Sequence, residues 1–182
     1  MESCSNPSYD RLNNNELRNI FNISLINARS LIPKLDSLLE CQNELLNDVT
    51  IFTETWTKDT ANINKLLQDH EDRPNYALIR KDRQNVGGGG VAISYNKHKI
   101  QMSRARLPAS KFEVVAAIGR RVGQRRKVCL IAAYLAPWYH ANRAKRCLEY
   151  ISDCIALLST RYADPYFYVG GDFNKRDIAA AI

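Results

Sequence analysis

The chain has 182 residues, 45% of them apolar and 25% charged, a composition typical of a globular domain with a substantial core. No apolar run is long enough to cross a membrane, and the polar N-terminus lacks the apolar segment of a secretory signal. The formal net charge of +7 favours a polyanionic partner. The cysteines form no CxxC pair, so we expect reduced, largely buried thiols in an intracellular protein; they are Cys4, Cys41, Cys129, Cys147 and Cys154.

The apolar periodicity predicts an α/β domain with a mixed sheet, because strand and helix patterns alternate along the chain. Residues 1–19 are polar, Asn-rich and without periodicity, so we expect a disordered leader before a domain over 20–182. In chain order, the predicted elements are a strand over 20–26, a helix over 33–47, a strand over 49–53, a short helix over 61–68, strands over 76–80, 91–95, 112–119 and 127–135, a helix over 142–160, and a buried strand over 166–169 that ends at two glycines.

Two segments between these strands have unusual compositions. Gly87 to Gly90 are four consecutive glycines, which form either a flexible hairpin loop or a place where the backbone must stay bare. Residues 120–127 predict a basic hairpin tip. Most such charge runs are only solvated, and the alternative is contact with nucleic-acid phosphates through Arg120, Arg121, Arg125, Arg126 and Lys127.

Polar side chains follow four of the predicted strands, and ligand sites in α/β sheets form where strand ends converge. Phosphodiester hydrolysis needs a hard cation held by oxygen ligands, an oriented water, and donors to the phosphate. In such a site Glu54 would bind the metal with Asn27 beside it, and Asp172 would orient the water. Asn174 and Tyr134 would donate to the phosphate. Each residue alone has an ordinary explanation as a cap, a turn residue or a core tyrosine. Four strand ends that carry such residues in this order favour a site.

These motifs resemble the endonuclease/exonuclease/phosphatase superfamily: Asn27, Glu54-Thr-Trp56, Tyr134-Leu-Ala-Pro137 and Gly171-Asp-Phe-Asn174. Within it the chain is most similar to the apurinic-type endonuclease domain of non-LTR retrotransposons, through Asn27-Ala-Arg-Ser-Leu31 and through Arg80 followed by Gly88-Gly-Gly-Val91. The resemblance runs from about residue 22 to residue 174. It implies a DNase I-like four-layer α/β sandwich with mixed sheets, dependence on Mg²⁺ or Mn²⁺, and nuclear DNA nicking that primes reverse transcription, with a reverse transcriptase domain in the full-length protein as a candidate partner.

The sequence departs from the family pattern in two places. Arg29 stands where DNA-repair relatives often carry an acidic residue. The retrotransposon branch commonly lacks that acidic residue too. Beyond Asn174 the family continues to a further Asp and a Ser-Asp-His motif, which none of His70, His98 and His140 matches. We therefore expect a domain truncated after the Gly-Asp-Phe-Asn motif, with an uncovered apolar sheet face, weak or absent nuclease activity, and poor stability or self-association.

Two other functions remain open. One is a phosphatase or phosphodiesterase of the same superfamily that acts on an inositol phosphate, a sphingolipid or a poly(A) tail. The glycine-rich segment and the positive charge argue against it. The other is a non-catalytic remnant that binds nucleic acid through a basic face, for which binding would persist in EDTA and fall steeply with salt.

Overall fold

The computed structural model describes residues 21–58, 76–83 and 87–174. The predicted leader over 1–19 and the predicted helix over 61–68 lie outside these residues. Within them, every element expected from the periodicity is present. In chain order the elements are β1 (Ile23–Asn27), the 3-10 helix η2 (Ile32–Lys34), α2 (Leu35–Glu44), β2 (Val49–Thr53), β3 (Tyr76–Lys81), β4 (Val91–Asn96), β5 (Ile100–Ala105), β6 (Glu113–Arg121), β7 (Val128–Tyr134), α4 (Ala141–Arg161) and β8 (Tyr166–Asp172).

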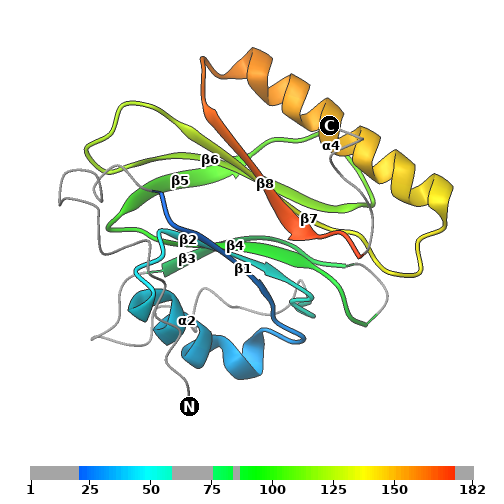
Figure 1. Ribbon diagram of the computed structural model, residues 1–182, viewed down its shortest axis with the longest axis horizontal. Coiled ribbons are helices and arrows are strands. Elements are labelled where there is room, and N and C mark those ends of the chain that lie inside the picture. Colours follow the sequence, from blue (N-terminus) through cyan, green and yellow to red (C-terminus); the bar gives the residue numbers. More distant parts are fainter. Residues whose placement is uncertain (1–20, 59–75, 84–86, 175–182) are drawn as a thin grey trace, which may run out of the picture.

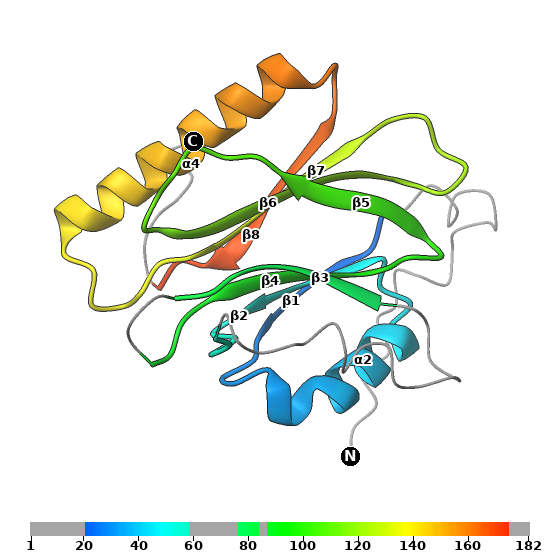
Figure 2. The ribbon, with the colours of Figure 1, turned by 180° about the vertical axis from the view of Figure 1, so that it is seen from behind.

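The strands form two mixed sheets that pack face to face. Sheet A has the strand order β1-β2-β4-β3 and sheet B the order β5-β6-β7-β8. Helix α2 covers the outer face of sheet A, and α4 covers the outer face of sheet B (Figures 1 and 2). The result is a four-layer α/β sandwich, which confirms the fold class expected from the sequence.

The alternation of side chains in β2 shows how the layers are filled. All of β2 is buried, but Phe52 belongs to the cluster beneath α2 with Leu35 and Leu39, whereas Ile51 faces the core between the sheets. Burial on both faces explains why β2 reads as a continuous apolar run rather than an alternating one. The same holds for β7, which is buried along its whole length between sheet A and α4.

The described cysteines match the expectation of largely buried thiols. Cys129, Cys147 and Cys154 are buried and free, and Cys41 is free and half-buried. Burial raises the pKa of Cys129 to about 11 and, as the largest of several causes, that of Cys147 to about 12. These thiols therefore behave as core side chains, because the thiolate needed for disulfide exchange or metal binding is strongly disfavoured.

The end strands differ from the sequence expectation. The strand over 166–169 was expected to be buried, but β8 alternates between exposed and half-buried residues. The reason is its place at one end of sheet B, so β7 covers it on one side only. Tyr166 is 49% exposed, Tyr168 38%, and Leu25 in the end strand β1 of sheet A 50%. Both glycines lie inside β8 rather than in a loop, and an added Cβ at Gly171 would sit 1.9 Å from the carbonyl oxygen of Ala133.

Strand β5 is the one element that sequence periodicity missed. Only its first and last residues, Ile100 and Ala105, are buried, so its interior has no apolar pattern to detect. It is ordered by pairing with β6, from Ile100 opposite Arg121 to Ala105 opposite Ala116.

Strand register brings the carboxyl ends of four strands to one end of the sandwich, called the site end below. In sheet A, β1 and β2 are parallel and Asn27 lies opposite Thr53. In sheet B, β7 and β8 are parallel and Tyr134 lies opposite Asp172. Because the sheets pack against each other, the residues that follow these strands meet across the interface.

Candidate active site

The side chain of Asn27 joins the two sheets at the site end. Its Nδ2 donates to Oε1 of Glu54 over 2.9 Å and to Oδ2 of Asp172 over 3.1 Å. The hydroxyl of Tyr134 donates to the same Glu54 oxygen over 3.4 Å. Four of the residues that the sequence singled out therefore form one hydrogen-bonded group, which we call the Asn27 cluster (Asn27, Glu54, Tyr134 and Asp172).

The backbone after β2 presents Glu54 to this cluster. Bonds between the loops after β1 and β2 extend the ladder past its ends, from Ala28 N to Thr53 O (2.9 Å) and from Ser30 N to Glu54 O (3.0 Å). Glu54 itself has a left-handed backbone with φ of 51°. A non-glycine residue in that region costs roughly 1–2 kcal/mol. Strain of this kind is concentrated at functional sites, where the surrounding bonds hold it in place.

The carboxylate of Asp172 is held by one donor on each oxygen. Oδ1 accepts from the backbone N–H of Asn174 over 3.1 Å, and Oδ2 accepts from Asn27. The Asn174 amide donates in turn to the carbonyl of Leu135 over 2.7 Å, and the N–H of Leu135 donates to the carbonyl of Asp172 over 2.9 Å. The structure thus places Asn174 beside the cluster, where its Nδ2 contacts the backbone after β7 and braces the Asp172 loop.

Tyr134 is a neutral donor. Its pKa is raised to about 12, first by burial and then by the neighbouring Glu54 carboxylate, while the Arg83 guanidinium acts in the opposite direction. The hydroxyl therefore keeps its proton through the neutral range, and can donate to an anionic oxygen.

The glycine run is a constrained segment, as one of the two sequence interpretations held. Gly88, Gly89 and Gly90 all have positive φ. An added Cβ at Gly89 would sit 2.3 Å from Cζ of Arg83, and one at Gly90 would sit 2.4 Å from Oγ1 of Thr55. The bare backbone allows these side chains to pack against it.

A buried ion pair ties this glycine segment to sheet B. Oε1 of Glu113 accepts from Nε of Arg83, and Oε2 accepts from the N–H of Gly90, both over 2.6 Å. The two side chains are 4% and 11% exposed. The Arg83 guanidinium lies 5.6 Å from the ring centroid of Tyr134 and 4.9 Å from that of Trp138. Sequence reasoning missed Arg83 and Glu113; a carboxylate opening the apolar strand β6 was the available signal.

The two carboxylates of the Asn27 cluster are suitable ligands for a hard divalent cation. Two carboxylates accept from one amide nitrogen, and no salt bridge to either is present among the described residues. The carboxylate oxygens of Glu54 and Asp172 are the ligand type that Mg²⁺ prefers, whereas Oδ1 of Asn27 accepts from the N–H of Arg29 over 3.3 Å. The described residues contain no group of three or more His, Cys, Asp and Glu side chains placed to hold a metal, so the site has two carboxylates rather than three.

The basic hairpin tip lies at the opposite end of the sandwich. The register of β6 and β7 runs from Glu113 opposite Tyr134 at the site end to Gly119 opposite Val128 at the tip. Six residues of strand span about 20 Å. Arg126 pairs with Asp164 and lies 3.8 Å from the ring centroid of Tyr166. The structure therefore does not bring the five predicted phosphate contacts, Arg120, Arg121, Arg125, Arg126 and Lys127, to the Asn27 cluster.

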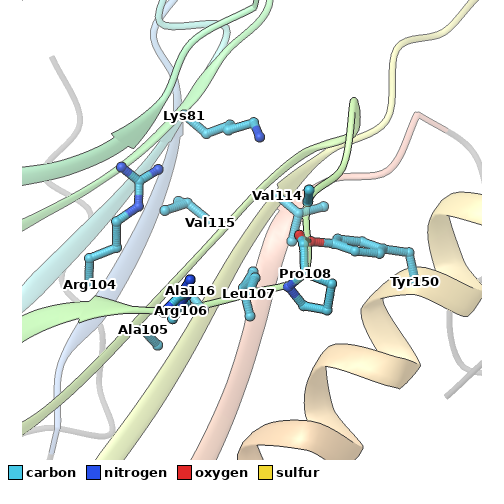
Figure 3. Close-up of a pocket in the computed structure, with 11 residues that line it drawn as sticks. Lys81, Arg104, Ala105, Arg106, Leu107, Pro108, Val114, Val115, Ala116 and Tyr150 are labelled. Carbon is cyan, nitrogen blue, oxygen red and sulfur yellow. Dashed lines mark hydrogen bonds between the residues drawn. The ribbon is translucent and has the colours of Figure 1, made fainter.

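A basic cavity of about 310 Å³ lies at the edge of the sandwich that the end strands β3 and β5 form. Lys81, Arg104 and Arg106 line it without any carboxylate, and Tyr150 and Pro108 stand across from Lys81 and Arg104 (Figure 3). Nζ of Lys81 donates to the carbonyl of Ser110 over 3.0 Å, and Nη2 of Arg104 to that of Arg80 over 2.8 Å. In the part of the chain that the structure describes, neither side chain forms a salt bridge, so no described anion compensates the two positive charges.

Sheet register places this cavity on the site end. Lys81 lies opposite Val91, which lies opposite Thr53, which lies opposite Asn27. Three strand spacings separate Lys81 from Asn27, or about 14 Å. Sequence reasoning missed the cavity, because its cations come from separate strands and form no run.

The sequence matches no protein-family model and no curated protein sequence. Solved structures do match. The endonuclease domain of TRAS1, a telomere-specific non-LTR retrotransposon, has a TM-score of 0.60 and 13% identity over 86% of this chain and 62% of its own. A mannosyl-6-phosphatase of Bacteroides thetaiotaomicron has a TM-score of 0.65 and 13% identity over 89% and 69%. D. rerio TDP2, complexed with a single-strand DNA product, has a TM-score of 0.54 and 16% identity over 88% and 64%.

These comparisons establish the class of fold. The chain has the endonuclease/exonuclease/phosphatase fold, the DNase I-like four-layer sandwich. It spans about three-fifths (62%) of the length of the TRAS1 endonuclease domain. Proteins with this fold include both nucleases and a sugar phosphatase, so the substrate has to be argued from the site. Among the described residues, no helix is long and apolar enough to cross a membrane.

Proposed function

We propose that this chain is a Mg²⁺-dependent DNA endonuclease domain of a non-LTR retrotransposon, which hydrolyses a phosphodiester to nick its target. The observation that supports it most is the amide of Asn27, which gathers the carboxylates of Glu54 and Asp172 beside the hydroxyl of Tyr134. This arrangement offers ligands for a hard cation, a carboxylate for a water, and a neutral donor for a phosphate oxygen. The retrotransposon assignment rests on the motifs in the sequence.

Each residue of the cluster has a separate task in this proposal. Glu54 and Asn27 hold Mg²⁺, or Mn²⁺ in its place. A cation held there would supply Lewis-acid stabilisation of charge on the phosphate. Asp172 accepts a hydrogen bond from the attacking water, and its fixed orientation aims that water at phosphorus. Tyr134 donates to a non-bridging oxygen, and Asn174 supplies a second donor from its amide.

The proposed partner is DNA. The formal net charge of +7 and the cations of the basic cavity place positive charge on the molecule and near the cluster. This charge would attract a phosphate backbone more strongly than a small neutral substrate. A nuclear location, and a reverse transcriptase domain in the full-length protein, follow from this proposal.

A plasmid-nicking assay with Mg²⁺ tests the proposal. Glu54→Gln and Asp172→Asn keep the shapes of the side chains but remove their charges, so nicking should fall at least ~100-fold in each. Mg²⁺ binding by calorimetry gives an independent readout, and Glu54→Gln should abolish it. Unchanged nicking and Mg²⁺ binding in both variants would refute the proposed site.

The same reagents test the two alternative functions. A phosphatase of the same fold would release phosphate from a small phosphomonoester and leave the plasmid intact. A non-catalytic nucleic-acid-binding protein would retain DNA binding in EDTA and show no cleavage with either metal. The thermal unfolding of each variant should be measured, because a loss of activity is informative only when the fold remains.

A further inference from the structure

The chain contains two tryptophans, and both lie exposed beside the Asn27 cluster. Trp56 follows β2, two residues after Glu54, and is 47% exposed; Trp138 follows β7 and is 60% exposed. Large aromatic side chains usually contribute to a core or an interface, so two exposed indoles at one end of the molecule need a partner.

Arg83 connects the two indoles. Its guanidinium lies 4.9 Å from the ring centroid of Trp138 and 5.6 Å from that of Tyr134. Gly88 separates it from Trp56: an added Cβ there would sit 3.6 Å from Nε1 of Trp56 and 3.8 Å from Nη1 of Arg83. The two indoles therefore flank one guanidinium next to the proposed catalytic tyrosine.

Buried neighbours hold both tryptophans out of the core. Thr55 and Thr57 on either side of Trp56 are 1% and 4% exposed, and their hydroxyls are 3.2 Å apart. The N–H of Trp56 donates to the carbonyl of Gly89 over 2.9 Å. Next to Trp138, Tyr139 is 5% exposed. The indoles are thus displayed by an ordered backbone and are already positioned for a ligand.

We propose that the exposed indoles of Trp56 and Trp138, on either side of the buried Arg83 guanidinium, form a stacking platform for unpaired bases of the strand whose phosphate occupies the Asn27 cluster. This inference rests on the proposed function, because it takes the substrate to be nucleic acid. The charge of Arg83 is balanced by Glu113, so the platform presents exposed aromatic surface without net charge. Those properties fit a neutral aromatic base rather than a phosphate, while the adjacent cluster fits the phosphate.

The platform gives the site a preference among substrates. Bases inside a uniform duplex are already stacked on each other and have no free face to offer. A strand with unpaired or easily unstacked bases beside the cleaved bond can place them on the indoles. Loss of one stacking side chain should weaken the binding of such a strand about 5- to 150-fold.

Tryptophan fluorescence tests the platform directly, since all of it arises from these two residues. A short single-stranded oligonucleotide is titrated in EDTA, so that no cleavage occurs. Trp56→Phe and Trp138→Phe each leave one reporter, and we expect saturable quenching in both. Trp56→Ala and Trp138→Ala should each weaken binding by the stated factor, whereas the Phe variants should retain most of it.

A matched control exists at the far end of the sandwich. Tyr166 is also an exposed aromatic residue with an arginine over its ring, Arg126 at 3.8 Å. Tyr166→Ala should leave the oligonucleotide affinity unchanged. An equal loss in Tyr166→Ala would mean that aromatic exposure, rather than position beside the cluster, governs binding.

An abasic oligonucleotide of the same length separates bases from backbone. Equal affinity and equal quenching with the abasic strand would overturn the platform, as would full affinity in both Ala variants. These results are independent of catalysis. Base-dependent quenching without nicking would support the platform and refute the endonuclease proposal. Nicking together with full affinity in both Ala variants would support the endonuclease proposal and refute the platform.

Discussion

Asn27 and Asp172 are 145 residues apart in the chain, yet Nδ2 of Asn27 donates to Oδ2 of Asp172 over 3.1 Å. The first belongs to sheet A and the second to sheet B. Their hydrogen bond therefore closes the interface between the sheets at the site end. It also means that the cluster exists only when the two sheets are correctly packed.

Asn27→Asp should make the cluster dependent on metal for its stability. The substitution removes the donor shared by Glu54 and Asp172 and places a third carboxylate beside them. In EDTA we expect a loss of about 1–3 kcal/mol in the free energy of unfolding. Mg²⁺ should restore most of it. Asn142→Asp, exposed in the first turn of α4, is the control and should cost nothing. A loss that Mg²⁺ does not reverse would argue against a cation at the cluster.

Glu113→Gln should be strongly destabilising. It leaves the Arg83 guanidinium buried without its anion, and Nη1 and Nη2 of Arg83 have no hydrogen-bond partner among the described residues. Breaking a buried pair from one side costs about 3–5 kcal/mol. Urea unfolding of Glu113→Gln, Arg83→Met and the double variant measures the coupling. We expect the double variant to be more stable than Glu113→Gln alone. Additive losses of unfolding free energy would show that Arg83 and Glu113 have no coupling energy.

Stability should fall at high pH, in part through Tyr134. Its pKa in the folded chain is about 12 against an ordinary value of 10.0, mainly because of burial, so the folded state holds the proton more tightly. This contribution is fully present below pH 10 and is lost as the pH rises towards 12. Tyr134→Phe should therefore flatten the decline of unfolding free energy in that window. Buried thiols contribute equally in both proteins and cancel in the comparison. An unchanged slope would contradict the shifted pKa.

The basic cavity and the hairpin tip make opposite predictions for DNA binding. If the cavity holds a phosphate, Arg104→Gln or Arg106→Gln should reduce the slope of log affinity against log salt by roughly 0.7–0.9. Arg125→Gln, at the tip, should leave it unchanged. Binding is measured in EDTA by fluorescence anisotropy across a salt series. The reverse pattern would support the hairpin contacts proposed from the sequence.

The exposed end strands predict self-association. Leu25, Tyr166 and Tyr168 present apolar surface along β1 and β8, and an uncovered strand edge is a template for pairing. Sedimentation velocity over a range of concentrations should show oligomers. Tyr168→Lys, which places a charge on the edge, should reduce them. A monomer with a sharp unfolding transition at every concentration would contradict the expectation.

Sequence and structure agree where the signal is local. The apolar run of β7 and the helical stripe of α4 are visible in the sequence, because burial on both faces or on one face imposes a period. Strand β5 has no such stripe and was missed, since pairing with β6 orders it rather than its own pattern. The burial of β8 was overestimated, because an apolar segment does not reveal whether it lies in the middle of a sheet or at its end.

The sequence by itself determined the elements and the polar residues that follow them. Asn27, Glu54, Tyr134 and Asp172 were identifiable because each lies at the end of an apolar strand or shortly after it. The tertiary structure decided which of the remaining charges and aromatics share that end. It placed Trp56, Arg83 and Trp138 beside the cluster and the run over 120–127 about 20 Å away along the strands. Strand direction and sheet order govern this choice, because they set which loops lie at the same end, and neither is written in any local pattern.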